Sequence, residues 1–113
     1  MRPQIRLARL DDTEIRNHLK SLKARQAYLR AHLDLLKQRK TVRLQQLERA
    51  RGLTSRDLLT RDVTEQAELN VIQTESDVVK TAYELEDLKI DIADSERQLK
   101  ILKLVGCLHH ITF

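Results

Sequence analysis

The stretch LERARGLTSRDLL, residues 47–59, decides how this 113-residue chain folds. Gly52 lies within it directly after two closely spaced arginines, a pattern typical of a helix that ends at a glycine with cations in its last turn. Thr54 follows as a candidate N-cap for a second helix, with Asp57 three residues later. The stretch therefore predicts a bend at Gly52 between two helices.

The segments on both sides of this bend contain no helix-breaking residue for many turns. Asp11 is expected to cap the first helix, and the second is expected to end near Val105, just before Gly106. A connection as short as Gly52 forces two long helices to lie antiparallel. The predicted organisation is a basic N-terminal segment (1–10), an all-α helical hairpin of coiled-coil type (11–105) and an apolar C-terminal tail (106–113).

Composition agrees with this fold class. The chain has 34% charged residues, two glycines, one proline and 3% aromatic residues, which suits long helices better than sheets or an aromatic core. No apolar run reaches the roughly 20 residues of a membrane span. Cys107 is the one cysteine, so no internal disulfide is expected. These features predict an intracellular, cytoplasmic protein, with cytoskeletal or nuclear location as alternatives.

The first helix carries a heptad seam that steps alternately by four and three residues. Its members are Ile15, Leu19, Leu22, Gln26, Leu29, Leu33, Leu36, Lys40, Arg43, Leu47 and Ala50. A bend at Gly52 would place residue i opposite about residue 105 − i, so Arg43 would face Asp62 and Lys40 would face Glu65. The matching seam of the second helix would then be Leu58, Asp62, Glu65, Leu69, Ile72, Ser76, Val79, Tyr83 and Ile90.

A second heptad stripe runs along the same second helix, and we expect it to bind a partner. Its large members are Val71, Val78, Leu85, Leu88, Ile92, Leu99 and Leu102, and the first helix adds Tyr28, Leu35 and Val42 at seven-residue intervals. One helix cannot turn two stripes toward one neighbour, so association into a three- or four-helix bundle is expected. The alternative is that broad apolar faces simply suit a thick hairpin.

Charge is divided unevenly along the chain. Residues 1–56 contain 15 Lys and Arg against 5 Asp and Glu, whereas residues 57–113 contain 6 against 12. A basic and an acidic helix attract when they are neighbours, which favours pairing within the chain. The alternative use of the basic helix is to bind nucleic acid or another polyanion.

Motifs for catalysis are missing from the sequence. There is no glycine-rich phosphate loop, no paired-cysteine zinc spacing, no nucleophile elbow and no His-Glu-x-x-His helix. Cys107, His109 and His110 could contact a soft metal, but no fourth ligand accompanies them. We therefore expect neither an enzyme nor a cofactor or metal site. The tail that holds these residues lacks charged side chains, and it is expected to fold back onto the bundle or to dock as a strand.

Together these features favour a non-catalytic structural or adaptor subunit that associates helix to helix with protein partners, as a homo- or hetero-oligomer. Its architecture resembles that of small coiled-coil subunits in cytoskeletal or centrosomal assemblies, a likeness of architecture alone. The alternative function is a basic coiled coil that binds nucleic acid or another polyanion.

Overall fold

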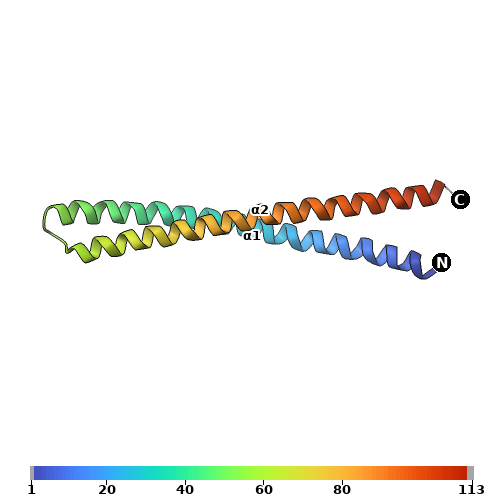
Figure 1. Cartoon of the computed structure of the whole chain (residues 1–113), viewed down its shortest axis with the longest axis horizontal. Coiled ribbons are helices and arrows are strands. Elements are labelled where there is room, and N and C mark those ends of the chain that lie inside the picture. The colour runs from blue at the N-terminus through green and yellow to red at the C-terminus, as the bar shows by residue number, and fades with distance from the viewer. Residues whose placement is uncertain (1, 112–113) are drawn as a thin grey trace. The chain divides into compact units, whose positions relative to one another are not determined.

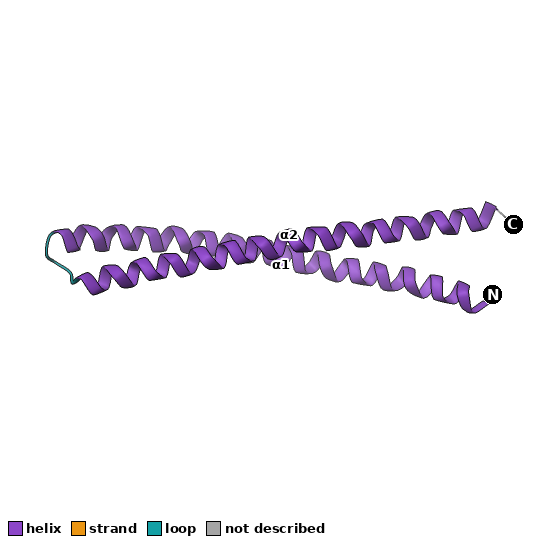
Figure 2. Ribbon diagram, viewed as in Figure 1, coloured by secondary structure: helices purple, strands orange, loops and turns teal. Residues whose placement is uncertain are grey.

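Two long helices, α1 (Arg2–Ser55) and α2 (Arg61–Ile111), make up the chain in this computed structural model (Figure 1). The structure describes the backbone of residues 2–111 and the side chains of residues 12–106. Throughout the described backbone there is no strand, and a short link at residues 56–60 joins the helices (Figure 2). The predicted all-α helical hairpin is confirmed.

The chain divides into two compact units, each containing a piece of both helices. The bend unit is Leu29–Leu85 and includes the link, and the terminal unit combines Met1–Tyr28 with Glu86–Phe113. Each unit buries its own apolar contacts between α1 and α2.

The bend lies at residues 56–60 and not at Gly52, so that prediction was wrong. Gly52 is inside α1, and no glycine in the described chain has a positive φ. Asp57 takes the left-handed conformation instead, with φ 57°. The amide of Leu58 donates to the carbonyl of Leu53 (2.9 Å), and the amide of Asp57 donates to that of Thr54 (3.1 Å). This is the Schellman arrangement that closes a helix, with an aspartate where glycine is commoner.

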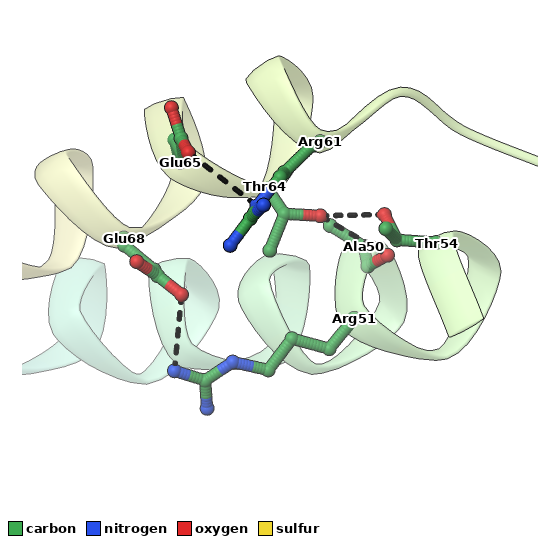
Figure 3. Close-up of polar contacts among 7 residues, drawn as sticks. All are labelled: Ala50, Arg51, Thr54, Arg61, Thr64, Glu65 and Glu68. Atoms are coloured by element: carbon green, nitrogen blue, oxygen red, sulfur yellow. Dashed lines mark hydrogen bonds and ion pairs between the residues drawn. The ribbon is translucent and has the colours of Figure 1, made fainter.

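Contacts beyond Gly52 explain why α1 continues through the glycine. The hydroxyls of Thr54 and Thr64 lie 2.6 Å apart, and the Thr64 hydroxyl also reaches the carbonyl of Ala50 at 3.4 Å (Figure 3). Ala50 and Thr64 are both buried. A glycine inside a helix costs only about 1 kcal/mol relative to alanine, so an extra turn that makes these contacts overrides the sequence signal.

The outer limits of the helices also differ from the predicted ones. α1 begins at Arg2 and not at Asp11, because Pro3 is compatible with a first helical turn and nothing after it interrupts the helix. α2 runs through Gly106 to Ile111, so residues 106–111 continue the helix and do not form a separate tail. The predicted fold-back of that tail and its metal-ligand candidates Cys107, His109 and His110 fall on side chains outside the described ones.

The predicted seam of α1 is confirmed in both units. Leu19 and Leu22 are buried in the terminal unit, and Leu29, Leu36, Leu47 and Ala50 are buried in the bend unit. The polar members Gln26, Lys40 and Arg43 are half-buried. Long Lys and Arg side chains can cover apolar surface with their stems while their charged ends reach water, which is why a seam tolerates them.

The predicted register between the helices was wrong. Lys40 Nζ lies 3.5 Å from the carboxylate of Glu75, not near Glu65, and Arg51 lies 3.4 Å from Glu68. In the bend unit, residue i therefore faces about residue 117 − i. Moving a bend by about six residues moves every opposing position by twice that number, which removes the expected pairing of Arg43 with Asp62.

The two stripes of α2 exchange their predicted roles. Seven residues of the stripe predicted to face a partner, counting the small polar residues at its heptad positions, are buried against α1. They are Val71, Thr74, Thr81, Leu85, Leu88, Ile92 and Ser95. Val78, Leu99 and Leu102 from the same stripe are half-buried. The apolar members of the predicted matching seam (Leu58, Leu69, Ile72, Val79, Tyr83 and Ile90) are instead 58–68% exposed. Because the link ends at Thr60, Thr64 is the first residue of α2 that faces α1. The heptad positions counted from Thr64 are those of the stripe that includes Val71 and Leu85, so this stripe is the one that packs against α1.

Candidate helix-association surface

The most distinctive surface of the bend unit is the side of α2 that faces away from α1. We call Leu69, Ile72, Ser76, Val79 and Tyr83 the outer stripe, and Thr64, Ala67, Val71, Thr74, Val78, Thr81 and Leu85 the inner stripe. Both keep alternating three- and four-residue steps. At about 100° per residue, the centres of the two stripes lie about 150° apart around the helix. α2 therefore presents two coiled-coil seams on nearly opposite sides.

Apart from Leu85 at its end, the inner stripe buries smaller side chains than the outer stripe exposes. Val79 and Tyr83 are each 68% exposed, whereas Val71 is 6% exposed. Inner positions include Thr64, Thr74 and Thr81, all buried. The Thr74 hydroxyl donates to the carbonyl of Asn70 (2.8 Å), which satisfies it within the helix. Small residues therefore occupy most of the inner stripe, and bulky apolar residues are left outside.

A shallow groove follows the outer stripe. Its lining residues are Ile72, Glu75, Ser76, Val79, Lys80, Tyr83 and Glu84. In a coiled coil, a side chain of one helix inserts into a hole formed by residues i, i+3, i+4 and i+7 of its neighbour. The groove contains two consecutive sets with this spacing, one starting at Ile72 and one at Ser76. Ser76 is the small residue shared by both, and it lowers the floor between its bulkier neighbours.

Charged groups border this groove on both sides. Glu75 and Lys80 follow the two edges of the stripe, and Glu84 lies beside its end. The Glu75 carboxylate is 3.5 Å from Lys40 Nζ on α1, and that side chain is still 49% exposed. A neighbouring helix would therefore meet an apolar centre with one acidic and one basic edge residue close to it.

The three α1 residues predicted to face a partner are exposed, as expected for an outward position. Leu35 (62%) and Val42 (50%) belong to the bend unit, and Tyr28 (68%) belongs to the terminal unit. Within the bend unit, the α1 stripe offers fewer large side chains than the outer stripe of α2.

The terminal unit holds a second shallow pocket between its two helix segments. Its lining residues are Glu14, Ile15, Gln98, Ile101 and Leu102. Ile15 and Leu102 are only half-buried there, while Ile101 is 56% exposed. The pocket brings together one carboxylate and one amide, without the nucleophile, base and oxyanion donors that hydrolytic chemistry requires.

Other kinds of site find little support in the described part of the chain. Among those residues, no group of three or more His, Cys, Asp or Glu could hold a metal ion, and no buried side-chain nitrogen or oxygen lacks a hydrogen-bond partner. No described helix is apolar enough over a sufficient length to span a membrane.

The basic residues of α1 form the remaining candidate. Lys23, Lys40 and Arg51 pair with acidic residues of α2. Arg30, Lys37, Arg39 and Arg49 are exposed and have no carboxylate within 4.0 Å in the described structure. Such cations could neutralise phosphates, although no aromatic platform for bases accompanies them.

Comparisons of the chain with protein-family models, with curated proteins and with solved structures return no match.

Proposed function

We propose that this chain is a non-catalytic structural or adaptor subunit that associates helix to helix with a protein partner in an intracellular assembly. Cytoskeletal and centrosomal assemblies are the settings that best suit a small coiled-coil subunit of this architecture. The proposal depends on one observation above all, the exposed outer stripe of α2.

Energetic considerations support this use of the stripe. Leu69, Ile72, Val79 and Tyr83 are each 58–68% exposed at coiled-coil spacing, which is unusual for a surface that meets only water. Fully covering one such side chain contributes roughly 1.5–3 kcal/mol, so covering four of them to the extent that they are exposed contributes about 4–8 kcal/mol. That is comparable with the lower estimates of the cost of association, so additional rim contacts would yield a measurable complex.

Photo-crosslinking in cells tests the proposal. A photoreactive amino acid at Val79 should form covalent adducts with a helical segment of heptad pattern, because helix–helix packing brings that position within side-chain contact. The same group at Gln38, an exposed polar position on α1, is the matched control. Adducts at Val79 that do not exceed those at Gln38 would contradict the proposal.

The unpaired arginines of α1 favour polyanion binding as the second candidate function. If they hold nucleic acid, affinity for duplex DNA or RNA should fall steeply with salt and should decrease when Arg30 and Arg39 are changed to Gln. An adaptor that uses the outer stripe would show negligible affinity at physiological salt. Filter binding between about 50 and 200 mM salt separates the two candidates.

A further inference from the structure

We propose that a second copy of this chain covers the outer stripe, with the two α2 helices packed parallel as a two-stranded coiled coil. The inference rests on the proposed function, since it assumes that the stripe is an association surface. It adds the identity of the partner, the orientation of the helices and the residues that select that orientation.

The apolar pattern favours a second copy as the occupant. A helix that packs on this stripe needs its own exposed heptad stripe of large apolar side chains, because coiled-coil layers pair knobs with holes on both helices. Leu69, Ile72, Val79 and Tyr83 meet that requirement. The exposed α1 stripe of the bend unit has Leu35 and Val42 as its large members and would leave part of the groove uncovered.

Net charge does not oppose this pairing. α2 is acidic by itself, and two acidic helices would repel each other. Within Leu29–Leu85, however, 10 Lys and Arg stand against 9 Asp and Glu, because α1 supplies cations alongside α2. Two bend units therefore meet as nearly neutral bodies, and local charge pairs at the edge of the stripe decide the orientation.

Those edge residues select the parallel orientation. In a parallel coiled coil, the residue just before one core position pairs with the residue five positions later on the other helix. Glu75 and Lys80 have this spacing, so a parallel dimer forms the Glu75 to Lys80 pair twice, once on each side. An antiparallel dimer would instead place Glu75 beside Ala82 and Lys80 beside Gln73. Only the parallel dimer gains opposite-charge contacts at this groove.

The core layers fit the same arrangement. A parallel dimer stacks each outer-stripe residue on its own copy, with the small Ser76 pair between the Ile72 and Val79 layers. A single polar layer of this kind fixes the alignment of two helices, as polar core residues do in other coiled coils. Glu86 would occupy the next core position after Tyr83, and two facing carboxylates end the favourable contact there.

The first test is whether the full-length protein is a monomer or a dimer in solution, measured by sedimentation. At about 100 μM, native chains should sediment as dimers, whereas a chain with Ile72→Glu and Val79→Glu should sediment as a monomer with unchanged helical circular dichroism. Leu35→Glu with Val42→Glu is the matched control, since it places the same charges on similarly exposed α1 residues, and it should remain dimeric. A native chain that is monomeric at this concentration would overturn the inference, as would a dimer lost only in the α1 control.

Cross-linking tests the orientation. In a Cys107→Ser background, Leu69→Cys should form an interchain disulfide on mild oxidation, because parallel helices bring the two thiols together. An antiparallel pairing of the same layers would hold them about 25 Å apart, so failure to cross-link in a dimer would overturn the parallel arrangement. Lys80→Glu should weaken the dimer about tenfold, and combining it with Glu75→Lys should restore most of the affinity.

The outcomes separate this inference from the proposed function. If the native chain is monomeric while the Val79 crosslinker still captures a helix of another protein, the adaptor function stands and self-association is wrong. If the crosslinker captures neither another protein nor a second copy, and mass is unchanged by Ile72→Glu with Val79→Glu, both proposals fail.

Discussion

The two faces of α2 in the bend unit have the same heptad spacing, but one is buried against α1 and the other is exposed. The inner face buries threonines and Val71, and the outer face exposes Ile72, Val79 and Tyr83. Size and hydrophobicity therefore do not decide which stripe α1 covers. The position of the link decides it, because the link sets the rotation at which α2 meets α1. The bulkier stripe is left exposed.

Substitutions at two adjacent residues of α2 should show the largest difference in stability between the two faces. Val71→Glu should lower the free energy of unfolding by about 3 kcal/mol or more, because it places a charge against α1. Ile72→Glu should change the stability of the isolated hairpin by about 0.5 kcal/mol or less, since that side chain is 60% exposed. Urea unfolding at low micromolar concentration, followed by circular dichroism, measures both. Equal effects would mean that the two faces are not distinguished as described.

The corresponding neighbours on α1 extend the comparison. Leu36 is 3% exposed and Leu35 is 62% exposed. Leu36→Ala should cost about 2–4 kcal/mol, because it leaves a cavity in the seam. Leu35→Ala should cost about 0.5 kcal/mol or less, as alanine is a good helix former on an exposed face. A larger loss from Leu35→Ala would place that residue in the core of the hairpin.

Substitutions at Gly52 in α1 and at Asp57 in the link should have smaller effects, with opposite signs. Gly52→Ala should stabilise the chain by about 0.5–1 kcal/mol, because Gly52 is helical and an added Cβ would meet no atom within 4 Å. Asp57→Val should destabilise it by about 1 kcal/mol, because a β-branched residue tolerates φ 57° poorly. Thermal unfolding of the two variants compares them directly. A loss of stability in the Gly52→Ala variant would indicate that the bend lies at Gly52.

The smallest expected effect concerns the register. Lys40 and Glu75 have side chains that are 36% and 49% exposed, so their coupling should be only about 0.2–0.5 kcal/mol and should weaken with salt. A double-mutant cycle with Lys40→Ala and Glu75→Ala measures it. The same cycle between Lys40 and Glu65 should give zero. Coupling to Glu65 and not to Glu75 would support the register of a bend at Gly52.

Helical class, antiparallel pairing and the α1 seam could all be predicted from the sequence, because heptad spacing from Ile15 to Ala50 allows α1 one dominant face. The face of α2 that packs against α1 could not be predicted in the same way. Two stripes with the same period compete there, and periodicity alone does not rank them. The choice follows from the residue at which α1 ends, and in the sequence Gly52 is a stronger local signal for that end than Asp57. Contacts of Thr64 with Thr54 and Ala50, which depend on the tertiary structure, override that signal.

Thiol reactivity at neighbouring positions tests the central claim most directly, that α2 buries the Val71 face and presents the Ile72 face. In a Cys107→Ser background, single cysteines would replace Val71 or Ile72, and their alkylation rates would be followed at increasing protein concentration. The Val71→Cys thiol should react slowly at every concentration. The Ile72→Cys thiol should react quickly in dilute solution and become protected as chains associate. Rapid reaction of the Val71→Cys thiol, with a protected Ile72→Cys thiol in dilute solution, would contradict the account.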